Sequence, residues 1–356
     1  MKKHAIIPVF LPHEGCPNDC VFCNQKVITA RPGLPEPAAF RTMVDTYLET
    51  ISGRGIETVE IAFFGGSFTG MPDAVQNTYL EIAGIYKSRG SIGKIRLSTR
   101  PDYIDDRILE NLRSHSVDII ELGVQSLDDT VLRLSNRGHD CAAVYESAAL
   151  IKSYGFELGI QLMIGLPGDS REKCVASAEK AAAIGPSIAR IYPTVILRGT
   201  ELEQMYINGD YRPLDQDEAI VTAKAMCLIL RKAGVNVIRI GLKSSDFIAE
   251  GREALGGTYH PAFRQLVESE IVKDILEAQL NGLLAELTSN PGEFSSVFHE
   301  SPPRRICFMG DSDSLSDMIG HKKSNRLYFE QKYSPMEFTF KTDTSLEKGS
   351  FRTMAL

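Results

Sequence analysis

Three cysteines near the start of the chain have the spacing of a metal or cluster ligand set. Cys16, Cys20 and Cys23 form a C-x3-C-x2-C pattern, and no fourth cysteine lies nearby. Clustered thiolates bind a soft metal or an iron–sulfur cluster. Because a 4Fe–4S cluster normally takes four cysteines, this set would leave one iron open to a substrate or a second cofactor. The spacing also leaves open a zinc site with His13 as its fourth ligand.

Further glycine and polar motifs follow strand-length apolar runs down the chain. Paired glycines at the end of such a run allow a ligand to approach the backbone closely, although a tight turn uses glycines too. The polar residues have an equally plain alternative as solvated side chains at the rim of a sheet. The motif residues are Gly65, Gly66, Ser67, Ser98, Gln125, Arg137 and Gln161.

The elements that carry these motifs alternate between strand and helix. We expect strands over 5–11, 58–64, 94–98, 119–124, 158–164, 189–193 and, as a possible seventh, 235–240. Amphipathic segments between them predict helices over 36–51, 74–87, 104–115, 142–154, 171–183 and 217–233. This alternation predicts parallel strands with right-handed crossovers, in a barrel, a partial barrel or an open sheet. The cysteine loop would lie at the C-terminal rim, where barrel chemistry is located.

The pattern changes after residue 242. Helical segments are expected over 261–284 and 309–333, a loop over 289–303, a strand over 336–341 and a partner strand near Phe351. The sequence therefore predicts two domains, a core over 1–242 and an accessory α/β unit over 243–356.

The cysteine loop resembles the cluster-binding motif of the radical S-adenosylmethionine (radical SAM) superfamily, including the aromatic Phe22 before the third cysteine. The resemblance implies that Cys16, Cys20 and Cys23 bind three irons of a 4Fe–4S cluster and that S-adenosylmethionine chelates the fourth. It also implies that electron transfer from the cluster cleaves this cofactor. The resulting 5′-deoxyadenosyl radical would abstract hydrogen from a substrate.

The other motifs extend the resemblance over residues 5–242. They are similar to the radical SAM domain of the elongator catalytic subunit and, more distantly, to oxygen-independent coproporphyrinogen III oxidase. The implied fold is α/β, a partial parallel (β/α)6-type barrel with a small C-terminal α/β extension. The implied S-adenosylmethionine ligands are Gly65, Gly66, Ser67, Ser98, Gln125, Arg137 and Gln161.

This sequence departs from both families at particular places. Ser98 and Gln161 stand where the oxidase carries acidic residues, and Asn24 stands where the oxidase has a further cysteine. Nothing after residue 242 resembles the acetyltransferase domain of the elongator subunit. The departures argue against coproporphyrinogen decarboxylation and acetyl transfer, and they indicate a relative whose substrate has diverged.

Composition narrows the class of protein. The 356 residues are 43% hydrophobic and 24% charged, as in ordinary globular proteins, and carry a net charge of −7, which argues against a non-specific nucleic-acid binder. No run of about 18 apolar residues occurs, so no membrane helix is expected. The seven unevenly spaced cysteines favour a reducing cytoplasm over a disulfide framework.

We therefore expect a cytoplasmic, oxygen-sensitive radical SAM enzyme suited to an anaerobic setting. Its partners would be an electron donor such as flavodoxin or ferredoxin and an unidentified substrate, either a small molecule or tRNA. The sequence identifies no catalytic residue. The alternatives are a non-catalytic iron–sulfur or haem-trafficking protein, a tRNA-modification relative without the acetyltransferase domain, and a zinc-stapled RNA-binding module.

Overall fold

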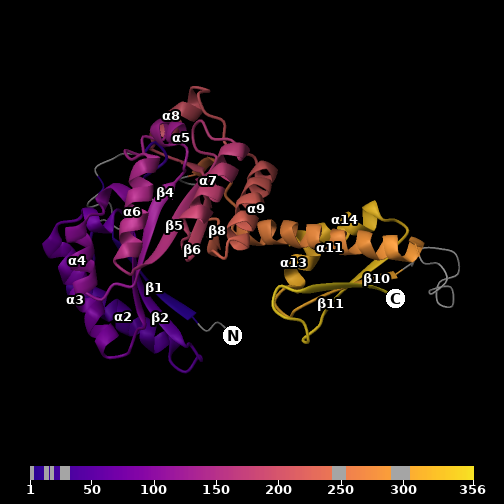
Figure 1. Ribbon diagram of the computed structural model, residues 1–356, viewed down its shortest axis with the longest axis horizontal. Helices are drawn as coiled ribbons and strands as arrows, with labels where there is room; N and C mark the ends of the chain where they lie inside the picture. The colour runs from indigo at the N-terminus through magenta and orange to yellow at the C-terminus, as the bar shows by residue number, and fades with distance from the viewer. Residues whose placement is uncertain (1–3, 12–15, 17–19, 25–32, 243–253, 290–304) are drawn as a thin grey trace. The chain divides into compact units, whose positions relative to one another are not determined.

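The computed structural model describes residues 4–11, 16, 20–24, 33–242, 254–289 and 305–356. The chain divides into two compact units, Met1–Pro261 and Ala262–Leu356 (Figure 1). The domain boundary after residue 242 stays a prediction, because residues 243–253 lie outside the described ones.

A seven-stranded parallel sheet forms the centre of the larger unit. Its strand order is β1-β2-β3-β4-β5-β6-β8, and each neighbouring pair is parallel. The order follows the chain, as a partial barrel requires. The strands are β1 (His4–Leu11), β2 (Thr58–Gly65), β3 (Lys94–Thr99), β4 (Ile119–Gln125), β5 (Glu157–Ile164), β6 (Ile188–Pro193) and β8 (Asn236–Ile240).

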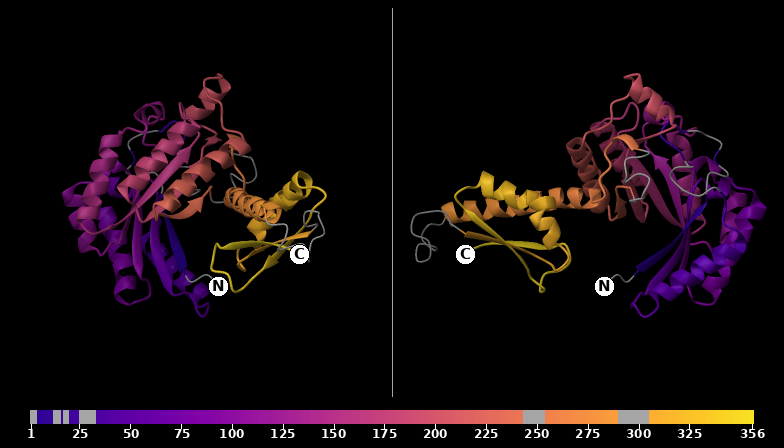
Figure 2. Two further views of the ribbon diagram at one scale, coloured as in Figure 1. Left: turned by 45° about the vertical axis from the view of Figure 1, so that its right-hand side comes forward. Right: turned by 180° about the vertical axis from the view of Figure 1, so that it is seen from behind.

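Helices connect the strands and cover the outer side of the curved sheet (Figure 2). Four of them begin at an aspartate whose carboxylate accepts a hydrogen bond from a backbone N–H of the first turn: Asp105, Asp128, Asp140 and Asp215. The helices are α2 (Pro37–Ile51), α3 (Asp73–Ser88), α4 (Asp106–Ser114), α5 (Asp129–Leu134), α6 (Cys141–Ser153), α7 (Arg171–Ile184), α8 (Glu201–Ile207) and α9 (Gln216–Lys232). The predicted α/β half-barrel is confirmed, including its seventh strand.

The two faces of this sheet differ in chemistry. On the outer face, Phe63 contacts Phe40 of α2 and Tyr79 of α3, and apolar side chains such as Leu122 and Ile160 are fully buried. The residues that alternate with them point to the inner face and are largely polar or charged. Apolar burial against the helices stabilises the sheet, and the inner face is left to carry functional groups.

The smaller unit is the predicted C-terminal α/β extension. Its sheet has the order β11-β10-β12, in which β10 (Arg305–Gly310) pairs parallel with β11 (Glu337–Thr342) and antiparallel with β12 (Phe351–Ala355). The core contains Leu276, Leu280, Phe308, Phe329 and Phe338. The helices are α11 (Phe263–Ser289), α13 (Leu315–Ile319) and α14 (Ser324–Lys332).

Some elements differ from the sequence-based expectation. Strand β10 was not predicted, and neither was the antiparallel pair formed by β7 (Val195–Leu197) and β9 (Ala254–Gly257) in the larger unit. The loop expected over 289–303 lies almost entirely outside the described residues. Over the described ranges, no helix combines the length and apolarity needed to cross a membrane.

Candidate functional site

The cysteine segment is anchored to parts of the chain that lie far from it in sequence. Cys20 is buried, with 4% of its surface exposed, and Cys16 and Cys23 are half-buried. The Cys23 N–H donates to the Cys20 carbonyl oxygen at 2.9 Å, which forms a turn. The intervening Val21 packs in an apolar cluster, and its N–H donates to the Ser135 carbonyl oxygen. The fold therefore holds two of the three thiols on one fixed turn.

The Arg137 side chain contacts the buried Cys20, as expected of a residue that lies next to a bound cluster. Its Nη1 donates to the Cys20 Sγ at 3.3 Å, and its Nη2 donates to the Gly123 carbonyl oxygen at 2.5 Å. The guanidinium thus bridges the cysteine turn and β4. Arg137 therefore places a positively charged group in direct contact with the Cys20 sulfur.

A second guanidinium, not identified from the sequence, supports the first. Arg100 is 2% exposed, and its Nη2 donates to the Arg137 carbonyl oxygen at 2.6 Å. Burial tends to lower the pKa of Arg100, but Asp102, Cys16 and Cys20 outweigh it and raise that pKa. Arg100 lies far from the cysteines in sequence, so this proximity could not be predicted from motif spacing.

The glycine pair brings the ends of β1 and β2 together. Gly65 has φ +121°, and a Cβ there would overlap the Leu11 carbonyl oxygen. The Gly66 N–H donates to that same oxygen at 3.2 Å. A shallow depression beside this junction is lined by Leu11, Gly66, Ser67 and Ser98, among others. Three of the predicted cofactor residues therefore border one depression.

Strand β4 ends at Gln125, whose backbone is in a strained conformation. The pairing with β5 is irregular between Gly123 and Gln125, and Gln125 has φ +68°. Such a backbone is uncommon for a residue with a side chain and is often found at functional sites. A Cβ on Gly123 would lie 2.8 Å from the Arg137 Nη2 and 3.0 Å from the Gln125 Nε2. Gly123 therefore makes room for both predicted cofactor residues.

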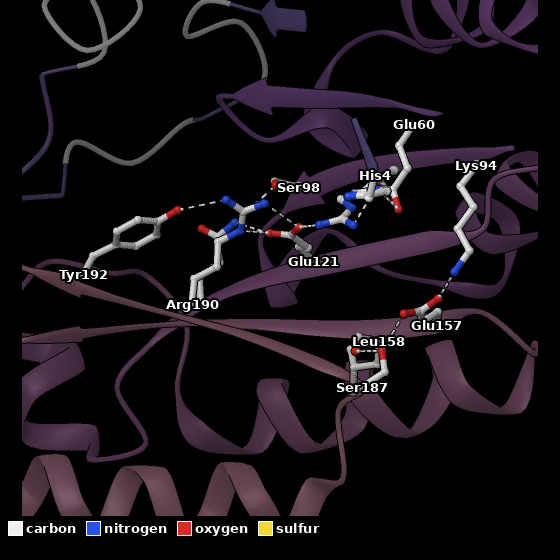
Figure 3. Close-up of polar contacts among 12 residues, drawn as sticks. His4, Glu60, Lys94, Ser98, Glu121, Glu157, Leu158, Ser187, Arg190 and Tyr192 are labelled. Carbon is white, nitrogen blue, oxygen red and sulfur yellow. Dashed lines mark hydrogen bonds and ion pairs between the residues drawn. The ribbon is translucent and has the colours of Figure 1, made fainter. Parts of the chain in front are cut away.

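Ser98 and Gln161 meet on the inner face, in a buried polar network. Figure 3 labels Ser98, Glu121 and Arg190 of this network. The Gln161 Nε2 donates to the Ser98 Oγ at 3.2 Å and to Glu121 at 2.9 Å. Glu121 accepts from Arg96 at 2.8 Å and from Arg190 at 2.8 and 3.0 Å. Burial tends to raise the pKa of Glu121, but Arg190 and Arg96 lower it. None of these three charged residues was predicted.

The structure brings the predicted residues together in three groups. Cys20 joins Arg137 and Gln125 around Gly123, Ser67 joins Gly66 and Ser98 at the depression, and Ser98 joins Gln161. All lie at or near the carboxyl ends of the strands, where barrel enzymes carry their active sites. Their individual roles stay predictions.

The donor set fits an iron–sulfur cluster. Cys16, Cys20 and Cys23 offer thiols, and Arg137 and Arg100 supply positive charge next to them. Among the described side chains, no three of His, Cys, Asp and Glu converge on a position for a single ion. A cluster requires no such convergence, since each thiolate binds a different iron. His13 of the zinc alternative lies outside the described residues.

Comparison with known proteins identifies the family. The model described as "Radical SAM superfamily" matches residues 10–181, and the one described as "Radical_SAM C-terminal domain" matches 186–273. The chain belongs to the radical SAM superfamily. Members of this superfamily are enzymes.

Relatives of this radical SAM chain include proteins named for tRNA modification. It is 26% identical over 254 residues to tRNA uridine(34) acetyltransferase of Methanocaldococcus infernus, covering 61% of this chain and 48% of the relative. It is 27% identical over 277 residues to Elongator complex protein 3 of Homo sapiens, covering 63% and 49%. The chain thus spans about half the length of these curated relatives.

A solved structure agrees with the fold. The archaeal Elp3 of Methanocaldococcus infernus, lacking residues 1–46, superposes with a TM-score of 0.63 at 20% identity. The match covers 77% of this chain and 64% of that one. The shared fold is the parallel half-barrel with a C-terminal extension.

Proposed function

We propose that this chain is a radical SAM enzyme that cleaves S-adenosylmethionine reductively at a 4Fe–4S cluster. The observation that carries the proposal is the contact between Arg137 and the Cys20 thiol. It joins the cysteine turn to the predicted cofactor-binding end of β4. The family assignment supports the three cysteines as the proposed cluster ligands.

Different residues would bind the cluster and S-adenosylmethionine. Cys16, Cys20 and Cys23 would bind the cluster. Gly65 and Gly66, at the junction of the β1 and β2 ends, would bind the amino-acid part of S-adenosylmethionine.

The remaining candidates are side chains with polar ends. Gln125 and Arg137 lie at the β4 end. A planar guanidinium such as that of Arg137 can donate hydrogen bonds to both oxygens of a carboxylate. Ser67, Ser98 and Gln161 would bind the more distant polar groups of the same cofactor.

When bound, the cluster and S-adenosylmethionine would supply an electron and the 5′-deoxyadenosyl radical that abstracts hydrogen from a substrate. The residues that would hold these groups lie at or near the carboxyl ends of the sheet strands. We further propose a cytoplasmic enzyme whose electron comes from a donor such as flavodoxin or ferredoxin.

The decisive experiment measures 5′-deoxyadenosine. The protein is reconstituted anaerobically with iron and sulfide, reduced with dithionite or with reduced flavodoxin, and given S-adenosylmethionine. We expect product from the wild type and none from C16A/C20A/C23A, with C227A as the matched control because Cys227 lies in α9 and is buried. A colourless protein that holds zinc would overturn the proposal. An iron–sulfur protein that makes no product with either reductant would favour a carrier.

A second candidate function is the modification of an RNA substrate. It is favoured by the names of the relatives, which include tRNA uridine(34) acetyltransferases. The proposed reaction is a radical modification of tRNA without acetyl transfer. If it is correct, unfractionated tRNA increases 5′-deoxyadenosine formation, and RNase-treated tRNA does not. Equal product with and without tRNA would argue for a small-molecule substrate.

A further inference from the structure

Two arginines lie side by side on the inner face of the half-barrel. Arg190 of β6 and Arg239 of β8 are paired in register. The pairing shifts just before them, so that Val237 lies opposite Ala189 and Ile240 opposite Ile191. The extra residue in β8 is a bulge that places Arg239 on the same face as Arg190. Bulges re-aim side chains and are common next to active sites.

The two arginines differ in their partners. Arg190 is held by Glu121 at 2.8 and 3.0 Å, and its guanidinium lies 5.1 Å from the centre of the Phe64 ring. In the described part of the chain, no carboxylate pairs with Arg239, which is half-buried. Neighbouring like charges on one face of a sheet are unfavourable. An anion at this place would remove the repulsion.

Tyr192 supplies a hydrogen-bond donor at the same place. Its phenolic oxygen accepts from the Arg190 Nη1 at 3.4 Å, as Figure 3 shows. Burial raises the pKa of Tyr192, so its hydroxyl stays protonated at neutral pH. Since that oxygen accepts from Arg190, the phenolic hydrogen is available to a ligand.

The network also carries an excess of positive charge. Arg96, Arg190 and Arg239 are accompanied by two carboxylates, Glu60 and Glu121. Glu60 pairs with Arg96, and Glu121 pairs with both Arg96 and Arg190, so among the described residues Arg239 is the one of the three without a carboxylate. For the residues that the structure describes, the excess is therefore located at the β6–β8 end of the inner face.

We propose that Arg239 and Tyr192, with the charge of Arg190 beside them, bind an oxyanion of the substrate, either a carboxylate or a phosphate. The site lies on β6 and β8, next to β5, which carries Gln161, and farther along the sheet from the β1–β4 ends near which the other proposed cofactor residues lie. This inference rests on the proposed function, and it defines the substrate as an anionic molecule.

The test measures anion binding by isothermal titration calorimetry. Reconstituted protein with S-adenosylmethionine is titrated with inorganic phosphate and, separately, with succinate at fixed ionic strength. The wild type should bind at least one of them saturably. R239Q should weaken binding by at least about tenfold, Y192F should weaken it less, and R239K should retain most of it. R171Q is the matched control, because Arg171 is an exposed residue at the start of α7.

Each outcome has a defined meaning. Phosphate binding that tRNA displaces assigns the oxyanion to RNA, phosphate binding that tRNA leaves unchanged assigns it to a small phosphate ester, and succinate binding assigns it to an organic acid. Binding of neither probe, or R239Q binding like the wild type, overturns the inference. An equal loss in R171Q would mean general surface attraction and would overturn it too. The titration needs no reduction step, so failure of S-adenosylmethionine cleavage would be seen separately.

Discussion

At the scale of single residues, the main feature of the site is a pair of buried arginines next to the cysteines. Arg137 contacts Cys20 directly, and Arg100 is fixed behind it by Asp102 and the Arg137 carbonyl. Both guanidiniums are buried, where charge interactions are weakly screened. We therefore expect them to affect the charge state of whatever the cysteines hold.

The R100Q variant tests this effect. A cluster gains negative charge when it is reduced, so removal of a buried positive charge should shift its midpoint potential to a more negative value. Potentiometry followed by electron paramagnetic resonance measures the shift. R100K should keep a potential close to that of the wild type, and R107Q is the control because Arg107 is exposed. An unchanged potential in R100Q, with normal iron content, would contradict the prediction.

Gly123 provides a second test at this scale. In G123A the new Cβ would crowd the flexible ends of Arg137 and Gln125 but no backbone atom closer than 3.5 Å. We expect S-adenosylmethionine affinity to fall by about tenfold, with little change in melting temperature. Equilibrium binding and thermal unfolding measure the two quantities. G84A is the control, since a Cβ there meets nothing within 4 Å; equal losses in both variants would contradict the assignment.

At the scale of elements, the inner face of the sheet depends on one carboxylate. Glu121 is 1% exposed and is the acceptor for Arg96, Arg190 and Gln161. Buried ion pairs are costly to break, because the remaining charge stays without compensation. The network therefore fixes the relative positions of β3, β4, β5 and β6.

We expect E121Q to destabilise the protein by about 3–5 kcal/mol. Urea unfolding gives the difference in free energy. E157Q serves as the control. Glu157 lies on β5 and pairs with Lys94, which is 40% exposed, so its loss should cost at most about 1 kcal/mol. If E121Q and E157Q lost similar amounts of unfolding free energy, burial would not explain the stabilisation by the Glu121 network.

The elements themselves were largely predictable, but their register was not. The apolar runs and amphipathic segments predicted the seven parallel strands, and a parallel sheet brings the motifs at their ends to one edge. Gly123, Arg100 and Arg239 were missed because their roles depend on two local irregularities, in β4 and β8, and on contacts across the fold. Strand β10 was missed because its short apolar run lacks the alternation that separates a strand from a helix.

At the scale of the whole molecule, one buried histidine links the site to stability. His139 is 8% exposed, and burial and the nearby Arg137 lower its pKa from 6.5 to about 4. The folded state therefore favours the neutral ring, whereas the unfolded chain binds a proton below its ordinary pKa. Stability from this group is present above pH 6.5 and is lost as the pH falls toward 4.

Between pH 7 and pH 5 the loss from His139 should be about 2 kcal/mol. Urea unfolding of the wild type at the two pH values measures the total change, and H139Q should reduce that change by about this amount. H115Q is the control, because His115 lies at the end of α4, where its Nδ1 is 2.9 Å from the Asn111 carbonyl oxygen. If H139Q and the wild type lose the same stability on acidification, His139 is not the group responsible.

The order of the strands has a consequence for biosynthesis. Because each strand of the large sheet pairs with the one before it, every new strand can join an edge that already exists as the chain leaves the ribosome. The proposed cluster and S-adenosylmethionine residues are all present once β5 has emerged. Arg239 arrives only with β8. The proposed cofactor-binding part of the site can therefore assemble during translation before the proposed substrate-binding part is complete.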